Sequence, residues 1–164
     1  MKRLVFVSAV LFLFFSALTG CVHLAINPDL SLKPEEMPTA EEIGELNSLL
    51  DTVVYSRQYE MDVFDCSNMT AFMYDFLTAR NYKCVIISGT TSLWRLLFGG
   101  ELGRGHDWII AEKNGKKFWV EATSRSIAPS NWYDEYFWQL HFNSLKEAKK
   151  FWRGWHLPKG EWDY

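Results

Sequence analysis

Residues 106–123, HDWIIAEKNGKKFWVEAT, decide the fold, because two apolar-rich runs flank the dipeptide Asn114-Gly115. Asn-Gly is the favoured centre of a two-residue type I′ turn, in which both residues take positive φ. The segment therefore predicts a β-hairpin in which Lys113 lies opposite Lys116, and the same register continues along both strands.

This register divides the side chains of the hairpin between two faces, because successive residues of a strand point in opposite directions. The first face carries His106, Trp108, Ile110, Trp119, Glu121 and Thr123. The second face carries Asp107, Ile109, Ala111, Phe118, Val120 and Ala122. Glu121 becomes the diagonal neighbour of His106, within reach of a carboxylate that can hydrogen-bond one imidazole nitrogen and select the tautomer.

Two amphipathic helices are predicted before the hairpin. Thr39 and Glu42 fit a capping box for a helix at about 40–54, and its apolar face consists of Ile43, Leu46, Leu49, Leu50 and Val53. Asp65 is a suitable N-cap for a helix over 66–80, whose core-facing stripe is Met69, Phe72, Met73, Phe76 and Leu77. We expect both helices to pack on the sheet.

The residues around these elements complete the expected domain. Residues 84–88, CVIIS, predict a short buried strand, and residues 89–105 contain five glycines and predict a loop. The segment from residue 129 is crowded with aromatic residues, which we expect to form a second core layer over the sheet. Ser144 and Glu147 fit the cap of a short helix at 144–152.

Cys66 stands at the predicted start of the second helix, where unsatisfied N–H groups and the helix dipole favour a thiolate. A histidine oriented by an acid would favour the thiolate further. Cys66, His106 and Glu121 therefore form a candidate set of nucleophile, general base and orienting acid.

Together with the elements around them, these residues resemble the transglutaminase-like branch of the papain-type cysteine enzymes. The resemblance covers about residues 55–125: DCS opening a helix, a strand, a glycine-containing loop, GHDW opening a strand and WVEAT on the next strand. It implies an α+β fold in which the cysteine-bearing helix packs on an antiparallel sheet. It also implies that Cys66 is the nucleophile, His106 the base and Glu121 the orienting acid.

The orienting acid departs from the family pattern, and the side-chain donor of the oxyanion hole is not fixed by the resemblance. The family acid is usually aspartate, so the extra methylene of Glu121 changes its reach, although Thr123 keeps the threonine that follows it. The papain-type oxyanion hole implies an upstream side-chain donor, for which Gln58 is the best local candidate. The alternative for Gln58 is an ordinary surface residue.

The resemblance implies a thiol-dependent enzyme acting on amide or peptide bonds, with a peptide or protein substrate and no cofactor. Hydrolysis is favoured over cross-linking because water is always available. The alternatives are a binding or assembly module that keeps the fold without the reaction, a disulfide between Cys66 and Cys84, and a zinc site of Cys66, His106 and Glu121.

The N-terminal segment predicts attachment to a membrane. Lys2 and Arg3 precede a charge-free apolar run at 4–18, and LTGC at 18–21 resembles the lipobox of prokaryotic lipoproteins. We expect a signal peptide at 1–20, a lipid on Cys21, a tether at 21–39 and an extracytoplasmic domain at 40–164. The alternative is an uncleaved anchor helix.

Composition excludes other classes of protein. The chain has 164 residues, a formal net charge of −3 and 48% hydrophobic residues, enough for one domain with its own core. No basic stripe indicates nucleic-acid binding.

Overall fold

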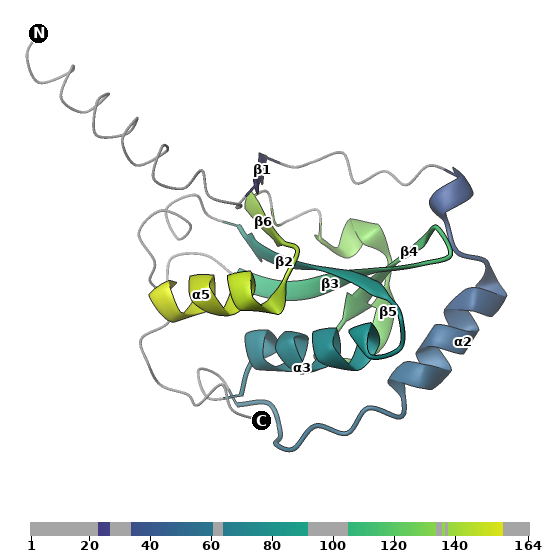
Figure 1. Ribbon diagram of the computed structural model, residues 1–164, viewed down its shortest axis with the longest axis horizontal. Helices are drawn as coiled ribbons and strands as arrows, with labels where there is room; N and C mark the ends of the chain where they lie inside the picture. The colour runs from purple at the N-terminus through teal and green to yellow at the C-terminus, as the bar shows by residue number, and fades with distance from the viewer. Residues whose placement is uncertain are drawn as a thin grey trace, which may run out of the picture.

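In the described part of the chain, six strands form one antiparallel sheet in the order β1-β6-β2-β3-β4-β5 (Figure 1). The computed structural model describes residues 23–26, 34–60, 64–91, 105–133, 136 and 138–155. The strands are β1 His23–Ile26, β2 Lys83–Thr90, β3 Gly105–Lys113, β4 Lys116–Glu121, β5 Ser126–Ala128 and β6 Trp138–Phe142.

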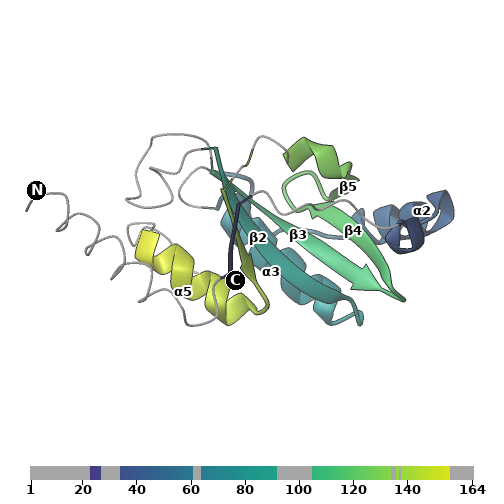
Figure 2. The same ribbon diagram turned by 90° about the horizontal axis from the view of Figure 1, so that it is seen from above.

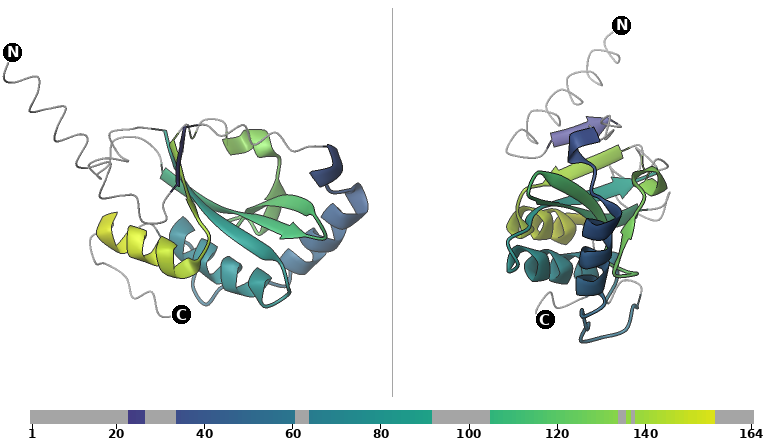
Figure 3. Two further views of the ribbon diagram at one scale, coloured as in Figure 1. Left: turned by 45° about the horizontal axis from the view of Figure 1, so that its top comes forward. Right: turned by 90° about the vertical axis from the view of Figure 1, so that its right-hand side faces the viewer.

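The three α-helices of the described residues contribute to one core on a single face of this antiparallel sheet, so the architecture is α+β. They are α2 Ala40–Leu50, α3 Cys66–Thr78 and α5 Leu145–Trp155, with short 3-10 helices η1 Pro34–Glu36 and η2 Ser130–Tyr133. The helices α3 and α5 lie side by side on one face, and η2 lies across the sheet from them (Figures 2 and 3). None of the helices in the described part is long and apolar enough to cross a bilayer.

The predicted hairpin is confirmed in turn and register. Asn114 and Gly115 have φ of 53° and 76°, as a type I′ turn requires. Lys113 pairs with Lys116, and the ladder continues to the pair Ile109 and Val120. The two faces of the hairpin therefore carry the side chains that the sequence assigns to them.

The predicted caps are also present. The hydroxyl of Thr39 accepts from the backbone of Glu42, whose carboxylate accepts in return, and Asp65 caps α3 by accepting from Ser67. The Ser144 hydroxyl accepts from the Glu147 backbone at the start of α5. Because these contacts are local, sequence spacing is enough to predict them.

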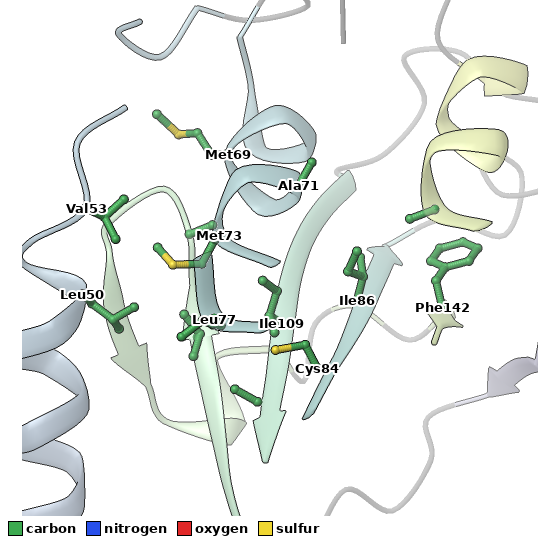
Figure 4. Packing of buried hydrophobic residues seen from close by; sticks show 14 of the residues in the cluster. Leu50, Val53, Met69, Ala71, Met73, Leu77, Cys84, Ile86, Ile109 and Phe142 are labelled. Atoms are coloured by element: carbon green, nitrogen blue, oxygen red, sulfur yellow. The ribbon is translucent and has the colours of Figure 1, made fainter. Parts of the chain in front are cut away.

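The main core lies between the sheet and the helices (Figure 4). It joins Leu50 of α2, Met73 and Leu77 of α3, Ile109 of β3 and Phe142 of β6. Trp152 of α5 is part of the same cluster, so aromatic residues do cover this face as expected. A second, smaller cluster on the opposite face consists of Ile87, Trp108, Trp119, Ala128 and Tyr133.

The expected tether at 21–39 differs from the structure. His23–Ile26 form β1, which pairs with β6 at the edge of the sheet, and Pro34–Glu36 form η1. Strands pair through backbone N–H and C=O groups, which every residue type except proline provides in full. An edge strand can therefore form without an alternating hydrophobic pattern in its sequence. The predicted signal peptide, Cys21, and most of the predicted glycine loop, at 92–104, lie outside the described residues.

Candidate functional site

His106 and Glu121 form a close pair on the η2 face of the sheet. His106 is the second residue of β3 and Glu121 the last residue of β4, and Nε2 of the imidazole lies 2.5 Å from Oε2 of the carboxylate. The type I′ turn sets the register that makes them diagonal neighbours. The extra methylene of glutamate therefore does not prevent the contact that the resemblance implies.

Further donors hold the Glu121 carboxylate in place. Thr123 donates to Oε1 from its backbone N–H at 3.0 Å and from its hydroxyl at 2.6 Å, and the Tyr133 hydroxyl donates to Oε2 at 3.3 Å. Burial opposes the charge, but the hydrogen bonds from His106 and Thr123 outweigh it and lower the pKa of Glu121. The carboxylate is therefore charged at neutral pH and fixed in one orientation.

Aromatic rings surround the His106 imidazole on the same face. Its centroid lies 6.1 Å from that of Trp108, 6.4 Å from Tyr133 and 5.9 Å from Tyr136. Trp108 and Tyr133 stack at 4.2 Å, and the imidazole side chain keeps 20% of its surface exposed. The imidazole therefore lies beside aromatic rings while one part of it faces solvent.

Cys66 is the first residue of α3 and is partly buried. Its Sγ lies 3.8 Å from Oδ2 of Asp107, which accepts the hydrogen bond of the thiol. Both Cys66 and the buried Cys84 are free thiols, which contradicts the disulfide alternative.

Asp107 was not singled out by the sequence analysis as a partner of Cys66. Its side chain is buried on the α3 face of β3, where the predicted alternation of faces places it. The indole Nε1 of Trp152 donates to its Oδ1 at 3.3 Å, and Ser88 also hydrogen-bonds the carboxylate. Asp107 thus links α3, β2 and α5.

The environment of Cys66 corrects the expectation of a favoured thiolate. Burial raises the pKa of the Cys66 thiol well above its usual value, and the charges of Asp107 and Asp65 raise it further. A hydrogen bond with the Asp107 backbone opposes these effects without outweighing them. The helix dipole is a weaker influence than burial beside two carboxylates.

The site therefore spans two faces of one strand. His106 and Glu121 lie on the η2 face, whereas the Cys66 sulfur lies against Asp107 on the α3 face. His106 and Asp107 are consecutive residues of β3. The Cys66 sulfur therefore contacts the residue that directly follows His106 in the strand. Gln58 is exposed, and its oxyanion role stays a prediction.

Metal ligation has no geometric basis in the described part of the chain. No three His, Cys, Asp or Glu side chains there are grouped so that they could hold a metal ion. Because Cys66, His106 and Glu121 are all described, this contradicts the zinc alternative.

Comparison with known proteins found no similarity: no protein-family model, no curated protein and no solved structure matches the chain. The geometry of the site itself must therefore support any assignment of function.

Proposed function

We propose that this protein is a thiol-dependent acyl-transfer enzyme of transglutaminase-like fold that hydrolyses amide or peptide bonds. The observation that carries the proposal is the contact of His106 Nε2 with Glu121. A charged carboxylate at Nε2 selects the neutral tautomer with its proton on that nitrogen. The lone pair is then on Nδ1, which is the nitrogen that can take a proton from a thiol.

In the proposed reaction, the Cys66 thiol gives its proton to His106 Nδ1 as the sulfur attacks the substrate carbonyl carbon. The C–N bond then breaks, the amine leaves with the proton from His106, and a thioester remains on Cys66. Water attacks the thioester after giving a proton to His106, and the C–S bond breaks to release a carboxylic acid. The proton returns from His106 to the sulfur, so the enzyme is regenerated.

Glu121 supports this cycle by stabilising the imidazolium that forms twice in it. The backbone N–H of Cys66, in the first turn of α3, is a suitable donor to the tetrahedral oxyanion, because it has no partner within the helix. Lipidation of Cys21 would hold the enzyme at the outer surface of a membrane, where its substrate would be a peptide or protein of the cell envelope.

A non-catalytic binding module is the second candidate, and one observation favours it. Cys66 donates to a carboxylate, and its pKa is raised, so the resting thiol is a poor nucleophile. In that case the transglutaminase-like core would serve to bind a partner at the cell envelope.

Turnover by the full chain and two cysteine variants separates these candidates. Casein peptides serve as the general substrate. Newly formed amino groups measure hydrolysis, and mass spectrometry detects the thioester on Cys66. We expect hydrolysis by the native protein and by Cys84→Ala, and none by folded Cys66→Ala. Hydrolysis that survives in Cys66→Ala would refute the mechanism, and failure of all three to form product or thioester would favour the binding module.

A further inference from the structure

Asp107 makes a set of contacts that the proposed reaction does not use. Its carboxylate is buried between β3, α3 and α5, accepts from Cys66 at 3.8 Å and accepts from Trp152 at 3.3 Å. Burial raises the pKa of the Asp107 carboxyl, and the hydrogen bonds from Ser88 and Trp152 and the charge of His106 oppose this effect without outweighing it. The residue is therefore held in one place by groups from three elements.

We propose that Asp107 is a positioning residue for Cys66, whose carboxylate accepts the hydrogen bond of the thiol and holds the sulfur protonated on the α3 face of β3. The inference rests on the proposed function only in treating Cys66 as the nucleophile. In the resting state the protonated sulfur is hydrogen-bonded to Asp107. Its proton must then pass to His106 before the sulfur attacks the substrate.

The geometry explains why Asp107 cannot simply turn away from the thiol. Oδ1 is engaged by the Trp152 indole and Oδ2 faces Cys66, while Ser88 on the neighbouring strand also hydrogen-bonds the carboxylate. The Thr70 hydroxyl of α3 donates to the Asp107 backbone carbonyl at 3.1 Å. The start of α3 is thus tied to β3 at the residue whose carboxylate accepts the hydrogen bond of the thiol.

Three carboxylates act on the sulfur in this arrangement. Asp107 lies against it, Asp65 caps the same helix, and Glu121 acts from the other face of the sheet. All three carboxylates oppose a negative sulfur. In the proposed reaction His106, next to Asp107 in sequence, takes the thiol proton, so Asp107 and His106 would compete in deciding where that proton resides.

Alkylation by iodoacetamide tests this competition without requiring turnover. The thiolate displaces iodide from the reagent carbon, so the rate at each pH reports the thiolate fraction at Cys66, identified by mass spectrometry of its peptide. In Asp107→Asn the amide has almost the same shape and places no charge beside the sulfur. We expect the pH midpoint of alkylation to fall and the rate at pH 7 to rise at least about tenfold.

Thr70→Val is the matched control, because it removes a hydrogen bond between α3 and β3 without changing any charge. We expect it to lower the melting temperature while leaving the alkylation midpoint unchanged. An unchanged midpoint in folded Asp107→Asn, or an equal shift in both variants, would overturn the proposal.

A second measurement needs no change at residue 107, in case that variant does not fold. The infrared difference spectrum between the native chain and Cys66→Ala isolates the S–H stretching band of Cys66. We expect the band at the lowered frequency of a thiol that donates to a carboxylate, and the frequency of a free thiol would overturn the proposal. Either result is independent of whether casein peptides are hydrolysed.

Discussion

His106 and Glu121 meet across the end of the β3–β4 hairpin, with 2.5 Å between imidazole Nε2 and carboxylate Oε2. The contact depends on two local features: a type I′ turn that sets the register and a threonine that anchors the carboxylate. Four donor groups converge on the carboxylate, so its position does not depend on His106 alone.

In the proposed reaction, replacing Glu121 by glutamine should lower kcat by about 10²–10⁴-fold, the usual contribution of a positioned general base. The side chain keeps its size, but a neutral amide can donate to Nε2 and so place the imidazole proton on Nδ1. That tautomer cannot accept the thiol proton. Steady-state hydrolysis of casein peptides measures the effect, and Glu121→Gln with native kcat would contradict the role of Glu121.

Glu121 should also contribute to stability in a pH-dependent manner. Its pKa is lowered in the folded state, so its contribution is present above the ordinary glutamate value of 4.5 and is lost as pH falls through the folded pKa. The difference in unfolding free energy between the native protein and Glu121→Gln should therefore shrink on acidification. Urea unfolding at a series of pH values measures it, and a difference independent of pH would contradict the assignment.

Gly89→Ala should destabilise the fold by about 1–3 kcal/mol, the usual cost of overpacking a core. A Cβ at Gly89 would lie 2.5 Å from Cη2 of Trp108, whose ring is fully buried and stacked on Tyr133. Gly44→Ala in α2 is the matched control, because a Cβ there meets nothing within 4 Å and alanine is the better helix former. Urea unfolding should show a loss at Gly89 and a small gain at Gly44.

Asp65→Asn should make Cys66 more reactive without weakening α3. Asparagine is as good an N-cap as aspartate, so the helix start should be preserved. The Asp65 charge, which raises the pKa of the Cys66 thiol, would be removed. Iodoacetamide should alkylate Cys66 faster at pH 7 than in the native protein, with an unchanged melting temperature. A rate at or below the native one would contradict this electrostatic role.

Much of the fold follows from short-range patterns in the sequence. The Asn114-Gly115 turn, the caps at Thr39 and Asp65 and the strand after α3 all form as predicted, because each depends on residues a few positions apart. The pairing of His106 with Glu121 follows from the same hairpin, since a known turn fixes which residues are diagonal neighbours.

The environment of Cys66 and the edge of the sheet were decided by tertiary structure alone. Asp107 lies 41 residues from Cys66 in sequence, and Trp152 lies 45 residues from Asp107, so no local spacing relates them. Their meeting depends on how α3 and α5 pack over one face of the sheet. The strand β1 likewise depends on the backbone of β6, which pairs independently of side-chain pattern.

The sequence by itself therefore determined the hairpin, its two faces and the partner of His106, because turn chemistry and strand alternation act over short distances. Only the tertiary structure decided the charge state that the thiol prefers. That preference reflects burial and the placement of carboxylates from separate elements, and these outweigh the local dipole of the helix that carries Cys66.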